Sequence, residues 1–172
     1  MQTTVTKEKP ITKDSYIFTV TAAARILGID KYSIESVRFS EILNKFIVQF
    51  EDSDPLLGGQ QKFLTKQNFY RDFANSRRER RHQILVKRTN QPLTFSATSS
   101  KDMMASRYVL ELTPSTITCN CKDQEVQRNL KLPQQCCKHS YALMELLGMQ
   151  TLSLIAYRKD KVYQNIVDNL EF

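Results

Sequence analysis

The sequence predicts a mixed α+β protein of 172 residues, built from two small modules. Residues 45–51 alternate apolar and polar side chains, as a β-strand with one buried face does. Residues 65–83 instead repeat aromatic side chains at helical spacing, after a threonine that can cap a helix. All four cysteines fall within residues 119–137, between a predicted β-hairpin and a predicted helix. These three observations indicate an α+β fold whose second half is held together by its cysteines.

A short alanine-rich helix is predicted over residues 19–29, because Thr19 can cap its first turn and Gly28 can end it. The next segment, residues 33–39, is compatible with either a helix or a strand. The favoured interpretation is a β-hairpin formed with the alternating strand described above. An alternative remains open, in which a second helix starts near Asp30 and forms a helix-turn-helix that enters the DNA major groove.

The helix predicted over residues 65–83 changes character along its length. Its first half carries Phe69 and Phe73, which we expect to lie in the core. Its second half and the residues that follow concentrate basic side chains, with Glu79 as the single acid among them. Both a phosphate-binding surface and a solvated helix face without a ligand are compatible with this basic cluster. The basic cluster comprises Arg77, Arg78, Arg80, Arg81, Lys87 and Arg88.

Residues 89–92 are polar, end in proline, and are expected to separate the two modules. The predicted domains are a polar tail at residues 1–15, a module at 16–90 that contains the basic helix, and a module at 91–172. Beyond residue 148 the second module carries apolar side chains at helical intervals, which predicts one or two C-terminal amphipathic helices.

Two close pairs of metal-binding side chains lie in the second module. Cys119 and Cys121 form one pair, and Cys137 and His139 form the other, with fifteen residues between the pairs. Three thiolates and one imidazole are typical of a closed, structural zinc site. A disulfide framework is disfavoured because we expect a reducing compartment, and an iron–sulfur cluster because it prefers four cysteines at other spacings. Cys136 could replace Cys137 as a ligand, or be an ordinary buried residue.

The segments that flank the two pairs predict how the ligands are presented. Alternation over residues 107–112 and β-branched residues over 116–118 indicate a hairpin that ends at the first pair. Good helix formers over 140–148 place the second pair at the start of a helix. The polar spacer, residues 122–136, is predicted to be a surface loop. The helix residues expected to face the hairpin are Leu143, Leu146 and Leu147.

This pattern of Cys-x-Cys, a spacer and Cys-x-His running into a helix resembles the SWIM zinc finger, over residues 92–149. The resemblance implies a compact hairpin-plus-helix module of a kind found in proteins that bind DNA or other proteins. It also implies one structural Zn²⁺ held by the two pairs, with Cys137 rather than Cys136 as the third cysteine. The sequence departs from the family in its doubled cysteine and in Ser140 and Tyr141, where small aliphatic residues are frequent.

A formal net charge of +7 and a pI near 9.3 favour a nucleic-acid partner, because cations that neutralise phosphates gain affinity by releasing counterions. The expected function is nucleic-acid binding, with DNA favoured, by a non-enzymatic zinc protein. The alternative is an adaptor that recognises a protein partner through the zinc module and the C-terminal helices. Besides the basic cluster, the residues expected to contact nucleic acid are Lys122, Arg128, Lys131 and Lys138.

Catalysis and membrane insertion are not expected. The only histidines are His82 and His139, the second is assigned to zinc, and no spacing of carboxylates demands an active site. No small-molecule substrate is therefore predicted. No run reaches the roughly eighteen apolar residues that a membrane helix needs. A polar beginning favours a cytoplasmic location.

Overall fold

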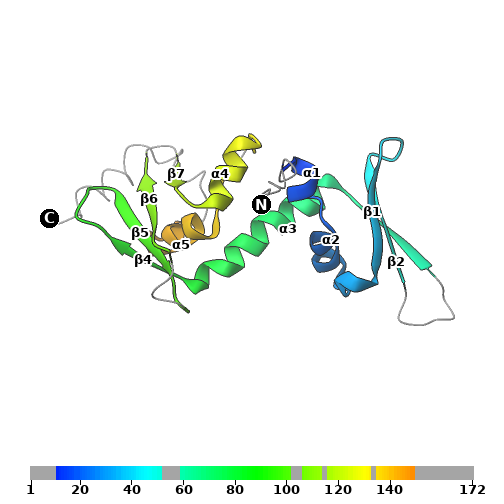
Figure 1. Cartoon of the computed structure of the whole chain (residues 1–172), viewed down its shortest axis with the longest axis horizontal. Helices are drawn as coiled ribbons and strands as arrows, with labels where there is room; N and C mark the ends of the chain where they lie inside the picture. The colour runs from blue at the N-terminus through cyan, green and yellow to red at the C-terminus, as the bar shows by residue number, and fades with distance from the viewer. Residues whose placement is uncertain (1–10, 52–58, 102–105, 114–115, 133–134, 150–172) are drawn as a thin grey trace, which may run out of the picture. The chain divides into compact units, whose positions relative to one another are not determined.

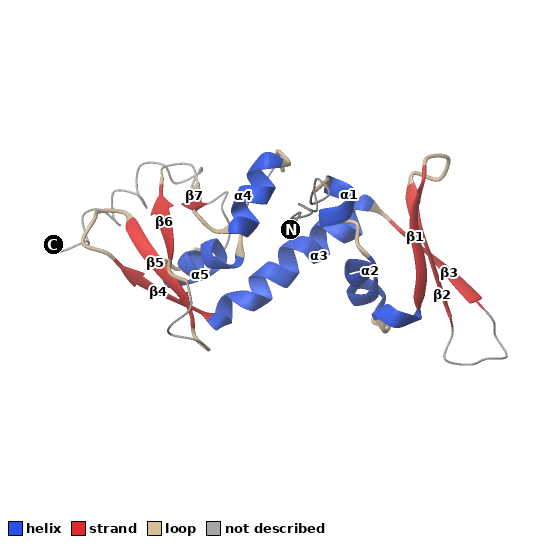
Figure 2. Ribbon diagram, in the orientation of Figure 1, coloured by secondary structure: helices blue, strands red, loops and turns tan. Residues whose placement is uncertain are grey.

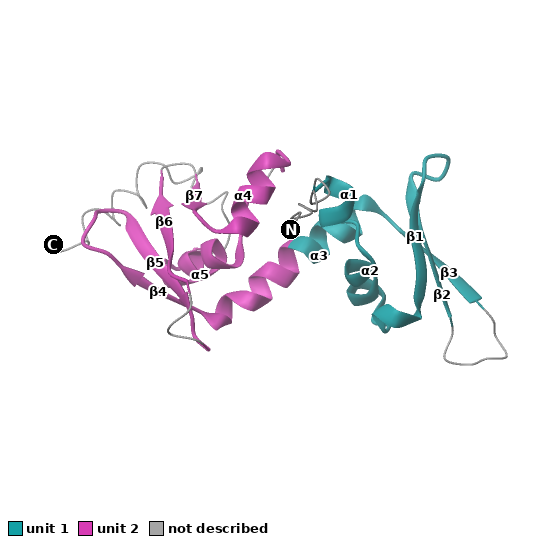
Figure 3. Ribbon diagram, viewed as in Figure 1, with its two compact units in different colours: residues 1–73 teal, residues 74–172 magenta. Residues whose placement is uncertain are grey.

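The computed structural model describes residues 11–51, 59–101, 106–113, 116–132 and 135–149. Helices and two antiparallel sheets together confirm the α+β class. The chain forms two compact units, residues 1–73 and 74–172 (Figure 3). We expected the boundary between the modules at residues 89–92, but the division between the two units falls between Phe73 and Ala74. The strand before residue 89 pairs with the strand after residue 92, which places both in the second unit.

The first unit contains a three-stranded antiparallel sheet (Figures 1 and 2). Its strands follow two short helices and are succeeded by a long helix that crosses the boundary between the units. In chain order the elements are α1 (Lys13–Tyr16), α2 (Val20–Leu27), η1 (Lys31–Ser33), β1 (Ile34–Ser40), β2 (Lys45–Glu51), β3 (Gly59–Leu64) and α3 (Lys66–Glu79).

The start and the end of α2 confirm the predicted capping residues. The Thr19 side chain accepts a hydrogen bond from the Ala22 N–H at 3.1 Å, and Gly28 adopts the left-handed conformation at φ 69°. After the helix, Asp30 caps only a 3₁₀ turn that leads into β1. Because β1 and β2 pair as an antiparallel hairpin, the hairpin interpretation is confirmed over the helix-turn-helix alternative.

Aromatic side chains fill the core of the first unit. Phe69 of α3 is fully buried, with its ring centroid 4.8 Å from that of Phe46 on β2. Phe18 completes the group, at 4.6 Å from Phe46 and 5.5 Å from Phe69. Thr65 caps α3 as predicted, through a hydrogen bond of 3.2 Å from the Asn68 N–H to the Thr65 Oγ1. Phe69 therefore belongs to the core, as predicted, whereas Phe73 is half-buried, with its ring centroid 5.4 Å from that of Tyr16.

Over its described residues, the second unit contains a four-stranded antiparallel sheet and two α-helices beyond α3. The elements are η2 (Arg80–Gln83), β4 (Ile84–Arg88), β5 (Thr94–Ser99), β6 (Tyr108–Leu112), β7 (Ile117–Cys119), α4 (Lys122–Asn129) and α5 (Lys138–Leu146). The strands lie in the order β4-β5-β6-β7, α5 packs against β4, and α4 contacts β7. None of the helices that the structure describes is long and apolar enough to cross a membrane.

Two expectations for the second unit were wrong. The spacer between the ligand pairs is not all loop, because residues 122–129 form α4 and bury Gln124, Val126 and Gln127. Leu146 does not face the hairpin, since its side chain is 55% exposed. Leu143 and Leu147 do pack against the core. The C-terminal helices predicted beyond residue 148 lie outside the described residues.

Candidate metal centre

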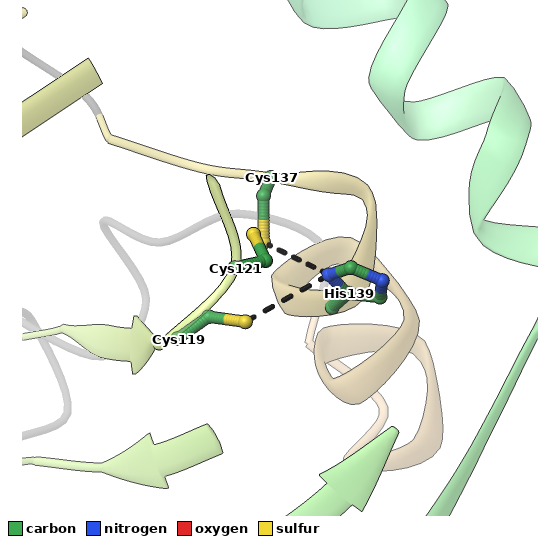
Figure 4. A group of neighbouring side chains, drawn as sticks. All are labelled: Cys119, Cys121, Cys137 and His139. Carbon is green, nitrogen blue, oxygen red and sulfur yellow. Dashed lines mark hydrogen bonds between the residues drawn. The ribbon is translucent and has the colours of Figure 1, made fainter. Parts of the chain in front are cut away.

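The four predicted ligands converge on one point (Figure 4). The ligand atoms of Cys119, Cys121, Cys137 and His139 all lie within 4.8 Å of one another, and all four residues are buried. The Sγ atoms of Cys119 and Cys137 each lie 3.7 Å from Nδ1 of His139. A tetrahedral zinc ion with ordinary Zn–S and Zn–N bonds requires an S···N separation of about 3.6 Å. The four residues could therefore hold one metal ion.

Three structural elements present the ligands. Cys119 ends β7, and Cys121 is the residue that precedes the first turn of α4. Cys137 holds the same position before α5, where its Sγ accepts a hydrogen bond from the Ser140 N–H at 3.4 Å. His139 lies in the first turn of α5. Two helix N-termini therefore face the site, and their positive ends favour the thiolate forms that bind a metal.

The cysteine thiols differ in acidity. The pKa of Cys121 is lowered, because its thiolate accepts a hydrogen bond from the Cys119 thiol and a second one from the Cys137 thiol. The pKa of Cys119 is raised for the complementary reason, since its proton is held in the hydrogen bond to Cys121. Metal ligation requires thiolates, so binding of an ion must displace the remaining protons.

Cys136 lies outside the ligand cluster, although it is adjacent to a ligand in sequence. It is only 4% exposed, and its Sγ lies 3.9 Å from the carbonyl oxygen of Cys137, to which it donates. Burial raises the pKa of the Cys136 thiol. These features are those of a small buried core residue, which was one of the two interpretations left open by the sequence.

Tyr108 and Asn120 support the site and were not singled out from the sequence. The Tyr108 ring packs on the His139 imidazole with centroids 4.5 Å apart and planes 31° from parallel. Asn120, between the first two ligands, accepts a hydrogen bond at its Oδ1 from the Val109 N–H at 2.9 Å. Tyr108 lies on the inward-facing side of the alternating strand, and this was the signal that could have identified it.

The basic cluster divides into arginines with internal partners and cations at the surface. Arg77 donates two hydrogen bonds to the Asp123 carboxylate, at 2.7 and 3.0 Å, and its side chain is only 16% exposed. The Nε of Arg81 lies 3.1 Å from Oε2 of Glu145, and its Nη1 donates a hydrogen bond to the Arg78 carbonyl oxygen at 2.7 Å. The exposed members of the cluster are Arg78, Arg80, Lys87 and Arg88.

The cations predicted around the ligand pairs lie at the surface of the second unit. Lys122, Arg128 and Lys131 are exposed, and Lys138 is half-buried. Lys122 Nζ is 3.5 Å from the Glu125 carboxylate, within the first turns of α4. An exposed pair of this kind contributes little to stability, so its lysine is available to another anion at little cost.

A cavity of about 590 Å³ lies beside α5. It is bounded by both polar and apolar side chains, among which the Arg78 guanidinium lies 5.6 Å from the centroid of the Tyr141 ring. The lining residues are Arg78, Arg81, Tyr141, Met144, Glu145, Gly148 and Met149.

The chain matches no protein-family model, and neither the curated proteins nor the solved structures contain a significant match to it.

Proposed function

We propose that this chain is a non-enzymatic zinc-binding protein that binds nucleic acid, with DNA favoured, through its second unit. The observation that carries the zinc assignment is the buried cluster of three thiols and one imidazole, whose ligand atoms lie within 4.8 Å of one another and in which two S···N separations of 3.7 Å fit a tetrahedral ion. Its ligands, spacing and helix resemble a SWIM zinc finger, and we assign residues 92–149 to such a module.

The metal is proposed to be structural. Four protein ligands complete a tetrahedron and leave no position for water or substrate. The cluster is also continuous with the apolar core, because the same group of buried residues contains Cys119, Cys121 and Cys137 together with Leu110 and Leu143. An ion in this position would connect β7, α4 and α5 and thereby stabilise the unit.

The distribution of charge supports a polyanionic partner for the second unit. Its described residues include twelve lysines and arginines against five aspartates and glutamates, whereas the described residues of the first unit include eight against six. We assign Arg77 and Arg81 to internal ion pairs and the phosphate contacts to Arg80, Lys87 and Arg88. Binding of this kind should be largely independent of sequence and should weaken steeply with salt.

Equilibrium binding of the zinc-loaded protein to labelled single-stranded and duplex DNA, titrated across salt concentration, tests this proposal. A triple variant, Arg80→Ala, Lys87→Ala and Arg88→Ala, should weaken binding and reduce the slope of log affinity against log salt by up to about 3. A matched triple variant removes the same number of exposed cations from the first unit and should bind almost normally. It carries Lys13→Ala, Lys45→Ala and Arg71→Ala. Absence of binding at low salt, or equal losses in both variants, contradicts the proposal.

The cavity beside α5 favours a second candidate function, that of an adaptor for a protein partner. Methionine and tyrosine side chains line it, and such adaptable surfaces suit protein recognition. A photo-crosslinking residue at Met149 distinguishes the two functions when compared with the same residue at Arg88. The adaptor function predicts protein crosslinks from position 149, whereas the leading function predicts nucleic-acid crosslinks from position 88.

A further inference from the structure

Helix α4 carries two buried glutamines between the ligand pairs. Gln124 is 2% exposed and Gln127 is fully buried. A buried amide is costly unless it makes hydrogen bonds, so such residues usually have defined partners. Here the partners are backbone groups of the two segments that carry the metal ligands.

Gln127 holds the segment that leads into the second ligand pair. Its Oε1 accepts a hydrogen bond from the Cys136 N–H at 2.9 Å, and its Nε2 donates to the Cys136 carbonyl oxygen at 3.3 Å. The side-chain amide thus pairs with both backbone groups of one residue. Because Cys136 directly precedes Cys137, this pairing fixes the backbone position of a ligand.

Gln124 joins the two ligand-bearing segments to each other. Its Nε2 donates to the Ile117 carbonyl oxygen on β7 at 2.9 Å and to the Gln135 carbonyl oxygen at 3.2 Å. Ile117 precedes Cys119 by two residues, and Gln135 precedes Cys137 by two residues. The Oε1 of Gln124 is buried and has no hydrogen-bond partner within the described part of the chain.

Helix α4 is itself anchored within the second unit. The two hydrogen bonds between Arg77 and Asp123 attach its first turn to the end of α3. Val126, on the same helix, is 7% exposed. The two glutamine side chains therefore extend from a helix whose own position is held by these contacts.

We propose that Gln124 and Gln127 are positioning residues of the metal centre, which hold the two ligand-bearing segments at binding distance from each other in the folded unit. Their hydrogen bonds offset part of the cost of ordering the fifteen-residue spacer when the metal binds, so their loss should reduce affinity. The proposal rests on the metal-binding part of the proposed function and not on nucleic-acid binding.

Competition between the full-length protein and a chromophoric chelator for Zn²⁺ tests this inference. Gln127→Met keeps the size of the side chain but removes both hydrogen bonds, and it should weaken zinc binding by about 10- to 100-fold. Gln124→Met should have a smaller effect, because it also removes the unpartnered buried oxygen. Gln83→Met, at an exposed glutamine of the same unit, is the matched control and should bind zinc normally.

Two further readouts distinguish positioning from general stabilisation. Co²⁺ bound to Gln127→Met should give weakened and shifted ligand-field bands, because the tetrahedron is distorted. In the zinc-loaded protein, hydrogen exchange of the Cys136 amide should be slow in the wild type and fast in Gln127→Met.

Wild-type zinc affinity and cobalt spectra in both glutamine variants would overturn the inference, even if the variants melt at lower temperature. If Gln127→Met does not fold, the zinc affinity of Gln124→Met is the test, and an affinity equal to that of the wild type would overturn the inference. Failure of the wild-type protein itself to bind zinc would instead overturn the proposed function.

Discussion

The two units of this chain differ in the types of residue that make up their small cores. The core of the first unit consists largely of aromatic rings, with Phe18, Phe46 and Phe69 in mutual contact. The second unit places Cys119, Cys121 and Cys137 among aliphatic residues at the centre of its core. A small domain has little apolar area to bury, so a metal ion is a common substitute for a larger core. The fold of the first unit should therefore be independent of metal, whereas that of the second should depend on it.

The largest effect is expected when one metal ligand is removed, because only the second unit should need the metal to fold. Cys119→Ser removes one ligand, and since structural zinc contributes on the order of 10 kcal/mol to such modules, the second unit should unfold. The first unit should keep its fold, because its core contains no ligand. Hydrogen exchange resolved along the sequence, with measurement of bound zinc, checks both statements. Cys136→Ala is the control and should retain the metal, and full retention of zinc and fold in Cys119→Ser would reject the ligand set.

The converse experiment removes an aromatic side chain from the first unit. Phe69 is fully buried, so Phe69→Ala should lower the free energy of unfolding of that unit by about 3–5 kcal/mol. Zinc affinity of the second unit should not change. Denaturant unfolding and chelator competition on the same sample measure the two quantities. Tyr70→Ala, at a more exposed ring of the same helix, should cost less, and loss of zinc from Phe69→Ala would show that the units are not independent.

A smaller effect concerns the arginine assigned to structure. Arg77→Ala leaves the partly buried Asp123 carboxylate without its bidentate partner, so the second unit should lose about 1–3 kcal/mol of stability. A double-mutant cycle with Asp123→Ala measures the coupling between the two side chains. The neighbouring Arg80→Ala is the surface control and should leave the melting temperature unchanged. Equal effects of Arg77→Ala and Arg80→Ala would contradict the division of the basic cluster.

The smallest effect is confined to alkaline pH. Burial raises the pKa of Tyr141 to about 12, so its ring should stay neutral in the folded unit while unfolded tyrosine ionises near pH 10. The contribution of this residue to stability is complete below pH 10 and is lost as the pH rises towards 12. Ultraviolet difference titration of wild type against Tyr141→Phe isolates this transition. A Tyr141 transition near pH 10 would show that the ring is solvated.

Features that depend on neighbours along the chain could be predicted from the sequence. Thr19 and Gly28 marked the ends of a helix because capping involves residues within one turn. The alternation in β2 identified a strand with one buried face for a similarly local reason. The four candidate metal ligands were recognisable because the members of each pair are two residues apart and few other roles require that combination.

Features that depend on partners distant in the sequence became visible only in the folded molecule. The spacer looked like a surface loop because a glutamine reads as polar whether it is exposed or buried. The backbone groups that form hydrogen bonds with the side chains of Gln124 and Gln127 belong to other segments, so the burial of these glutamines could not be read from the spacer itself. Arg77 and Arg81 looked equivalent to Arg80 until Asp123 and Glu145 were brought beside them. Local pattern fixes the conformation of a segment, whereas the burial of a polar or charged side chain is set by which other segments fold against it.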